Sequence, residues 1–255
     1  MHSYLNGLFV AILFCFLSAC ETTGSQVDNN DYKRTAIIDR ARAHTNLGAA
    51  YLQKNKLEIA LDEFTKAVEI MPTFAMAYNG LAMVRSALGQ DAEAEYNFKK
   101  AIKLDASISE TYNNYGTFLC SRGRYEESIT QFLAAVKNPL HGTPSVAYAN
   151  AGICSKRNGD IKGAERYLNK ALEIQPLTHA AAAHLADIQF SRGDAVLAKK
   201  TLQNALIAAP TAEVLWLAIK IERLLGDKNN VASYSLELRR KFPNAAETQL
   251  LLSGQ

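Results

Sequence analysis

The sequence is poor in the residues that make turns. Its 255 residues include only 14 glycines and 6 prolines, whereas average usage would supply roughly 30 of the two together. A β-sandwich or barrel needs a turn every ten residues or so, and this scarcity argues against both folds. Because 48% of the residues are hydrophobic and 21% are charged, the composition is that of a folded protein rather than a disordered one. We therefore expect a helical, globular body.

Catalytic and cofactor-binding motifs are missing as well. There is no phosphate-binding loop, no GxSxG sequence and no HExxH sequence. His179 and His184 are five residues apart, so they do not share a helix face as a metal-binding pair would. The 28 Lys and Arg residues barely exceed the 25 Asp and Glu residues, which gives little reason to expect a nucleic-acid partner. The sequence thus predicts no enzyme, no cofactor, no metal site and no small-molecule substrate.

The first twenty residues have the features of an export signal. Residues 8–17 read LFVAILFCFL, which is too short to span a membrane but suits the core of a signal peptide. The tetrapeptide LSAC, which ends at Cys20, resembles the bacterial lipobox, in which the cysteine is lipidated and becomes the new N-terminus. We therefore expect a lipoprotein signal peptide over residues 1–19 and lipidation of Cys20. A plain secretory signal with a chance cysteine is the alternative, and the lack of Lys and Arg before the apolar core departs from the usual pattern.

The segment that follows Cys20 is polar. Residues 21–35 read ETTGSQVDNNDYKRT and show no helical periodicity, so residues 20–36 are expected to form a lipidated N-terminus and flexible tether. Residue 21 is Glu rather than the Asp that marks inner-membrane retention in the enteric lipoprotein pattern. This favours a protein anchored by lipid in the outer membrane and facing the periplasm.

From residue 41 onward one pattern recurs six times. Its spacing is 34 residues, except for 36 between the third and fourth units. A first series of mostly small residues falls at Gly48, Ala82, Gly116, Gly152, Ala186 and Lys220. A second series falls at Ala60, Ala94, Ser128, Ala164, Ala198 and Ala232. Proline closes most units, at Pro72, Pro176, Pro210 and Pro243. The six units cover about 41–74, 75–108, 109–144, 145–178, 179–212 and 213–246, and the last fits only with a one-residue slip in its second half.

This pattern resembles the tetratricopeptide repeat, a helix–turn–helix unit of about 34 residues. The first unit shows the motif most fully, with Leu47-Gly48, Tyr51, Ala60, Phe64, Ala67 and Pro72. The resemblance implies an all-α fold, a right-handed superhelix (α-solenoid) of about six repeats over residues 37–255. In such a stack small residues let helices approach closely, and neighbouring units bury one another's apolar stripes. Glycines at positions 89, 123, 159, 193 and 226 fall in the turn within each unit, where a positive φ is needed.

Two features interrupt this regularity. The two extra residues lie in the segment 138–144, NPLHGTP, which is either a recognition loop or, as we favour, a tolerated insertion. Cys15 leaves with the signal peptide and Cys20 is lipidated, so Cys120 and Cys154 remain. Both are placed near the ends of the first helices of adjacent units. They either form a disulfide in the oxidising periplasm or stay as two buried thiols between repeats.

Binding is the function that remains, and in tetratricopeptide stacks the first helices of the units line a concave groove. Carried over by position, the groove residues of the first three units are Arg42, Thr45, Ala49, Leu52, Asn79, Met83, Ser86, Glu110, Asn113 and Thr117. The family's carboxylate clamp needs basic residues that this set does not supply. An extended partner with apolar side chains fits better. Each of these residues has packing between repeats as an alternative role.

The lipobox, the tether and the six repeats together resemble the type IV pilus biogenesis lipoproteins that serve as pilotins of the pilus secretin (PilF/PilW). The resemblance covers the whole chain, including LGAAYLQKNKLEIALDEFTKAVEIMP and YNNYGTFLCSRGRYEESITQF. It implies an outer-membrane lipoprotein that binds secretin subunits and promotes their outer-membrane localisation and multimerisation. It also implies a disulfide between Cys120 and Cys154. A periplasmic adaptor lipoprotein that recruits cell-wall hydrolases or synthases is the alternative, and an enzyme without a recognisable motif is a further one.

Overall fold

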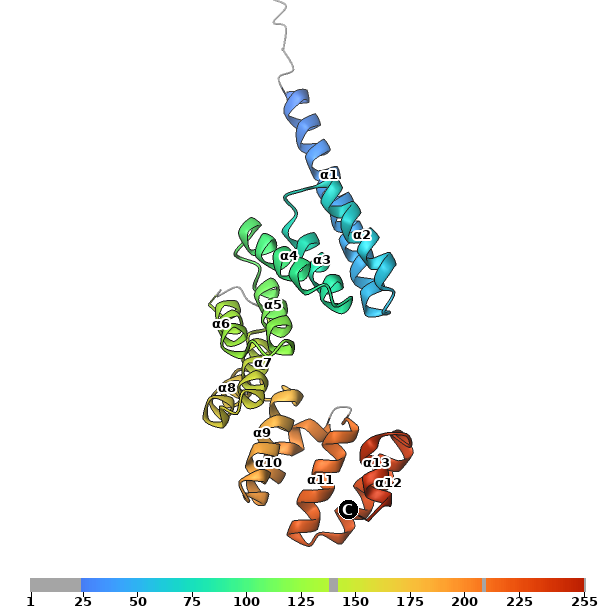
Figure 1. Cartoon of the computed structure of the whole chain (residues 1–255), viewed down its shortest axis with the longest axis vertical. Helices are drawn as coiled ribbons and strands as arrows, with labels where there is room; N and C mark the ends of the chain where they lie inside the picture. Colours follow the sequence, from blue (N-terminus) through green and yellow to red (C-terminus); the bar gives the residue numbers. More distant parts are fainter. Residues whose placement is uncertain (1–23, 138–141, 208–209, 255) are drawn as a thin grey trace, which may run out of the picture.

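The computed structural model describes residues 24–137, 142–207 and 210–254, and these residues form thirteen α-helices and no strand (Figure 1). The first helix of each repeat is α1 (Gly24–Gln53), α3 (Ala75–Ala87), α5 (Ser109–Ser121), α7 (Pro144–Arg157), α9 (His179–Ser191) and α11 (Ala212–Leu225). The second helix is α2 (Leu57–Ile70), α4 (Asp91–Leu104), α6 (Tyr125–Ala135), α8 (Ile161–Ile174), α10 (Ala195–Ile207) and α12 (Lys228–Lys241). A short α13 (Ala246–Leu252) ends the series. The predicted all-α repeat fold is confirmed.

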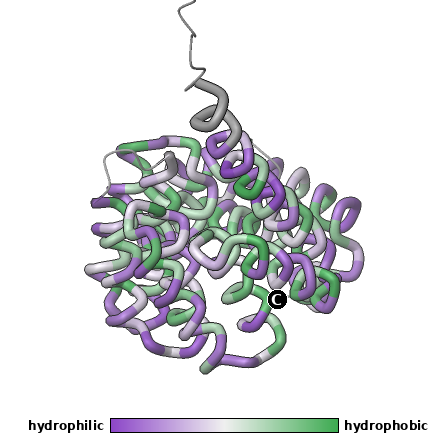
Figure 2. The backbone as a smooth tube through the Cα atoms, turned by 90° about the horizontal axis from the view of Figure 1, so that it is seen from above, coloured by the Kyte–Doolittle hydropathy of each residue, from purple (hydrophilic) through white to green (hydrophobic). Residues whose placement is uncertain are grey.

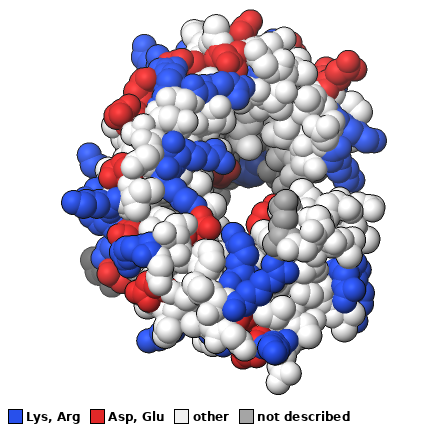
Figure 3. All heavy atoms as spheres, turned by 60° about the horizontal axis from the view of Figure 1, so that its bottom comes forward, with Lys and Arg blue, Asp and Glu red and all other residues white. Residues whose placement is uncertain are grey.

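The helices are arranged as a superhelix. Each first helix packs on its own second helix and on the first helix of the next repeat, from α1 against α3 through to α9 against α11. Seen from above, the chain winds round in a curve (Figure 2). A view into its lower end shows a ring of side chains around an open axis (Figure 3). The signal peptide, Cys20 and residues 138–141 of the predicted loop lie outside the described residues, and Pro144 occupies the first position of α7.

The repeating small and large residues explain why the hairpins stack. Five members of the second series, Ala60, Ala94, Ser128, Ala164 and Ala198, are fully buried. Four residues further along each second helix comes a large apolar residue with at most 2% exposure, at Phe64, Phe98, Phe132, Leu168 and Leu202. Three of them, Phe64, Phe132 and Leu168, pack closely against glycines of first helices. A Cβ added to Gly116 would lie 2.7 Å from the Phe132 ring, and one added to Gly152 would lie 2.6 Å from Leu168 Cγ.

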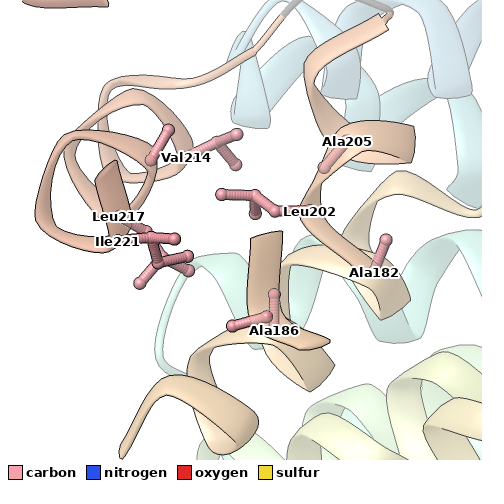
Figure 4. Close-up of a cluster of buried hydrophobic side chains, with 9 residues drawn as sticks. Ala182, Ala186, Leu202, Ala205, Val214, Leu217 and Ile221 are labelled. Atoms are coloured by element: carbon pink, nitrogen blue, oxygen red, sulfur yellow. The ribbon is translucent and has the colours of Figure 1, made fainter. Parts of the chain in front are cut away.

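The same packing continues through the C-terminal repeats. Val214, Leu217 and Ile221 of α11 meet Leu202 of α10 over the alanines of α9 (Figure 4). Apolar area buried in this way stabilises the stack by about 25 cal/mol per Å². Each repeat therefore depends on its neighbour for its core.

The turns within the repeats have the predicted geometry. All five turn glycines have positive φ, for example 75° at Gly123. In the first repeat Asn55 occupies the equivalent position with a φ of 55°. Asparagine tolerates the left-handed region better than most residues, which explains the exception.

An ion-pair cluster joins the second and third repeats. Arg124 Nη1 lies 2.6 Å from Glu95 Oε2, and Arg124 Nη2 lies 2.7 Å from Glu127 Oε2. The hydroxyl of Tyr115 donates to Glu95 Oε1 at 2.9 Å. The Arg124 guanidinium lowers the pKa of the Glu95 carboxyl to about 2, with Lys99 and Tyr115 contributing against the effect of burial.

The two ends of the chain differ from the sequence expectation. Residues 24–36 form the start of helix α1, in the segment for which the sequence indicated a flexible tether. Residues 30–35 are exposed on every side, which explains the absence of an apolar stripe. At the other end α12 shows the predicted slip: Val231 packs in the core while Ala232 of the second series is exposed. The 34-residue period did not predict α13. This helix packs on α11, in the same way as each first helix packs on the first helix of the next repeat.

Candidate functional site

The ten predicted groove residues fall into two groups. Thr45 and Asn79 are buried, with 8% and 3% of their surface exposed, so packing between helices accounts for them. The Thr45 hydroxyl donates to the Ala41 carbonyl of its own helix. The other eight are exposed or half-buried on α1, α3 and α5: Arg42, Ala49, Leu52, Met83, Ser86, Glu110, Asn113 and Thr117. These eight remain accessible to a partner.

Asparagine side chains link the first helices of repeats two, three and four. Asn114 Nδ2 of α5 donates to Asn79 Oδ1 of α3 at 3.4 Å. Asn150 Nδ2 of α7 donates to Asn113 Oδ1 of α5 at 3.0 Å. Asn113 and Asn150 are both half-buried. Because a primary amide carries a donor and an acceptor, these side chains can also bind the backbone of an extended partner. The sequence reasoning identified Asn79 and Asn113 but missed Asn114 and Asn150.

A pocket of about 180 Å³ lies between α3 and α5. Three predicted groove residues line it, Met83, Ser86 and Thr117, and Phe98 of α4 and Phe118 of α5 contribute aromatic surface. Met83 Sδ accepts a hydrogen bond from Asn114 Nδ2 at 3.4 Å. The pocket therefore combines an apolar wall with hydroxyl and amide groups. It has the size and character to hold one apolar side chain of a peptide beside the asparagine row.

A second pocket, of about 270 Å³, extends the first-helix surface into the C-terminal half. It lies among α7, α9, α11 and α13, and Trp216 and Leu217 of α11 give it apolar surface. Lys156 of α7 and Asp187 of α9 form an ion pair in it. The sequence analysis missed this site because it placed groove residues only in the first three repeats, and because α13 is not part of the repeat pattern.

The second pocket is lined by charged side chains of both signs. Burial and the nearby Lys156 ammonium hold the pKa of His184 below its usual range, so this imidazole is neutral at pH 7. Lys220, which occupies the small-residue position of the sixth repeat, extends its Nζ to 5.5 Å from the centre of the Phe190 ring. A lysine is therefore tolerated there because its charge is held over an aromatic face. In Figure 3 several Lys and Arg side chains border the opening of the superhelix.

The two remaining cysteines lie where the third and fourth repeats meet. A disulfide joins Cys120 of α5 to Cys154 of α7, whose Cα atoms are 5.9 Å apart. Both side chains are buried against Phe132 and Ala151. Ser128, the polar member of the alanine series, donates its hydroxyl to the Gly116 carbonyl at 2.7 Å and is thereby satisfied inside the core. The bridge fixes the spacing of α5 and α7, which carry Asn113 and Asn150.

The arrangement of the first-helix surface is suited to binding a peptide. Within the described residues no group of three or more His, Cys, Asp or Glu side chains is placed to hold a metal ion. None of the described helices combines the length and apolarity required to cross a bilayer. The first-helix surface instead offers amide groups and two apolar pockets along successive repeats. This is the chemistry that holds an extended peptide.

Comparisons with known proteins agree with this description. Tetratricopeptide repeat models match residues 41–74, 75–108 and 156–226. Over 247 residues the chain is 31% identical to the type IV pilus assembly protein PilF of Pseudomonas aeruginosa, covering 96% of this chain and 97% of that protein. A solved structure of P. aeruginosa PilF matches with a TM-score of 0.75 at 28% identity, over 86% of this chain and 100% of that one. PilW, described as a widely conserved type IV pilus biogenesis factor, matches with a TM-score of 0.71 at 29% identity, over 83% and 98%.

Proposed function

We propose a function for this chain from its family: it belongs to the tetratricopeptide-repeat proteins of type IV pilus biogenesis that include PilF. Within that role we assign it the task of a pilotin. It binds subunits of the pilus secretin in the periplasm and promotes their localisation to the outer membrane and their multimerisation there. The observation that carries this proposal is the similarity to PilF along nearly the whole of both chains.

The membrane attachment in this proposal comes from Cys20. Cleavage before this residue and its lipidation would leave the protein anchored in the outer membrane by its N-terminus. A lipoprotein carries several acyl chains, and more than one chain is needed for stable attachment. The 30-residue helix α1 then begins four residues after the anchor, at Gly24. At 1.5 Å per residue a helix of this length spans about 45 Å. The part of this helix that precedes the repeats, in which residues 30–35 are exposed, would hold the repeats away from the membrane surface, which a flexible tether would not do.

The partner surface in this proposal is the one built by α3, α5 and α7. An extended segment of the secretin would pair its backbone with Asn113 and Asn150 and place an apolar side chain in the pocket beside Thr117. No covalent chemistry is involved. The protein acts as an escort that holds a subunit until it assembles.

Two threonines allow a matched test of this surface. Thr117 of α5 is exposed at the pocket, and its hydroxyl donates to the carbonyl four residues earlier, at Asn113. Thr130 of α6 is exposed on a second helix and makes the same bond to Glu126. Thr117→Arg should block the pocket, whereas Thr130→Arg adds the same charge and bulk elsewhere.

The measurement is co-purification of the secretin with affinity-tagged, detergent-solubilised full-length protein. We expect the secretin to co-purify with the wild type and with Thr130→Arg, and to be lost with Thr117→Arg. Recovery of cell-wall hydrolases or synthases in place of the secretin would support the adaptor function and refute the pilotin proposal. Equal recovery of the secretin with both variants would place its binding site elsewhere on the chain.

A further inference from the structure

The largest of the pockets described here does not lie on the first-helix surface. It has a volume of about 470 Å³ and is formed by α8, α9 and α10, with the second helices of the fourth and fifth repeats as its two sides. Leu172 of α8, Leu185 of α9 and Leu197 of α10 provide apolar surface. The concave pockets are lined mainly by first helices, so this pocket opens on a different face of the superhelix.

A buried amide at this pocket lacks a hydrogen-bond partner. Gln189 of α9 is only 6% exposed and lines the pocket, and its Oε1 atom has no hydrogen-bond partner among the described residues. A buried acceptor without a donor costs about 1–3 kcal/mol. Such a group is explained if a ligand supplies the missing bond. A peptide group presents both an N–H and a C=O, so it can pair with a primary amide at two points.

In the equivalent pocket of the next repeat, the buried polar group has a hydrogen-bond partner within the chain. Between α10, α11 and α12 the corresponding cavity measures only about 80 Å³. Its buried carboxylate, Glu222, receives a hydrogen bond from Lys199 Nζ at 2.8 Å, and Tyr234 lines the remaining space. The chain thus fills this groove with its own side chains. In the pocket at Gln189 no side chain of the described residues fills the equivalent space or bonds to the amide oxygen.

The charged groups at the open pocket indicate the sign of the missing partner. Glu165 of α8 is paired with Arg192, the residue that follows α9, whose Nη1 lies 2.9 Å from Glu165 Oε1. Lys200 of α10 lines the same pocket, is exposed, and forms no ion pair among the described residues. One lysine is therefore left over beside a leucine-lined cavity and an unsatisfied amide. A carboxylate is the group that complements it.

We infer that the pocket formed by α8, α9 and α10 binds an extended peptide segment that carries an acidic side chain. One peptide group of the segment pairs with the Gln189 amide, its carboxylate pairs with Lys200, and an apolar neighbour contacts the leucines. The site is separate from the concave surface proposed for the secretin. The protein can therefore hold two partners at once and act as a bridge between components of the assembly.

Fluorescence anisotropy with a defined peptide tests this inference. The probe is a nine-residue fluorescein-labelled peptide with a central aspartate between leucines and amidated at its C-terminus, compared with versions that have asparagine or lysine at the centre. It is titrated with full-length protein in detergent. We expect the aspartate peptide to bind about tenfold more tightly than the lysine peptide. Binding of all three peptides with the same affinity would overturn the inference.

Variants locate the site. Lys200→Glu should abolish the preference for aspartate, whereas Lys162→Glu, the same change at an exposed position of α8 outside the pocket, should preserve it. Gln189→Leu should weaken binding about tenfold, which corresponds to 1.4 kcal/mol. It should do so without lowering the melting temperature, because it removes the unsatisfied oxygen. Loss of binding with a collapsed melting curve would instead mean that Gln189 is a structural residue.

Amide hydrogen exchange shows where the peptide binds, and the oligomeric state of the protein shows whether a second copy of the chain fills the pocket instead. The bound aspartate peptide should slow exchange in α9 and α10, and leave exchange at Thr117 of α5 unchanged. Protection of α3 and α5 in its place would put the peptide in the concave groove and contradict the inference. A concentration-dependent dimer that Lys200→Glu dissociates would show that the pocket is filled by a second copy of the chain. Since Lys200→Glu should leave co-purification of the secretin intact, failure here is distinguishable from failure of the proposed function.

Discussion

Replacing Gly80 of α3 by alanine should destabilise the fold through a single contact. An added Cβ would lie 2.1, 2.4 and 2.5 Å from three atoms of the Phe64 ring, far inside ordinary contact distance. Phe64 is 2% exposed, on α2 of the preceding repeat, so the ring cannot swing out into solvent to make room for the new atom. The two helices must therefore separate. Overpacking of this kind costs typically about 1–3 kcal/mol.

The net effect is smaller than this cost, because alanine favours a helix over glycine by about 1 kcal/mol. The close approach of 2.1 Å indicates the upper part of the overpacking range, so we expect a net loss of about 1–2 kcal/mol. For a domain of about 200 residues this corresponds to a fall in Tm of roughly 2–8 °C. Thermal and urea unfolding followed by circular dichroism measure it.

Gly48 of α1 is the matched control, because a Cβ there would meet the same three atoms of the Phe64 ring at a longer distance. A Cβ there would lie 3.0 Å from three Phe64 ring atoms, which a shift of a few tenths of an ångström can relieve. Gly48→Ala should therefore change Tm little. Phe64→Leu should reduce the cost of Gly80→Ala when the two are combined, since contacting residues are coupled. If Gly80→Ala melted at the wild-type temperature, or Gly48→Ala cost more, the proposed packing between repeats one and two would be refuted.

Three further predictions concern the disulfide, acid stability and the N-terminus. The purified periplasmic form carrying Cys20→Ala, from which the signal peptide with Cys15 has been removed, should show no free thiol after denaturation. Reductant should destabilise it by up to about 4 kcal/mol for a 34-residue loop, and two titratable thiols with a melting temperature indifferent to reductant would contradict this. The folded pKa of Glu95 is lowered from 4.5 to about 2, so its stabilising contribution is complete above about pH 4.5 and is lost as the pH falls towards 2. Glu95→Gln should flatten this part of the curve of stability against pH, and a curve identical to the wild type would refute the assignment. Cys20→Ala should leave the membrane fraction without unfolding, whereas continued sedimentation with outer membranes would refute lipid anchoring at this residue.

The repeat fold could be predicted because its cause is local and periodic. A helix hairpin that buries a shared stripe needs small residues at fixed positions, and Ala60, Ala94 and Ala164 mark these positions directly in the sequence. The turn at Asn55 and the slip that packs Val231 against the core follow from the same period. The helical start of α1 could not be predicted from that pattern. Residues 30–35 are exposed, so they need no apolar stripe. They are helical because the helix propagates from the packed part of α1, and this leaves no periodic signal in the sequence.

The binding surfaces could be predicted only in part, because they depend on contacts between repeats. Position within the repeat identified Met83 and Thr117, which meet in one pocket. It could not show that Asn79 is buried beneath the row to which Asn114 belongs. The pocket at Gln189 had no signal in the sequence, since it is the open version of a groove that the next repeat fills with its own side chains.

We propose that the α3–α5–α7 surface, held at the outer membrane by a lipid anchor, escorts the pilus secretin. The most direct test uses a strain that lacks the native copy and produces the wild type, Thr117→Arg or Thr130→Arg at equal levels. Multimeric secretin in the outer-membrane fraction is then measured by immunoblotting. We predict wild-type amounts with Thr130→Arg, and loss of the multimer with Thr117→Arg although that variant remains folded and membrane-bound. Full multimer with Thr117→Arg, or in the strain with no copy at all, would contradict the account.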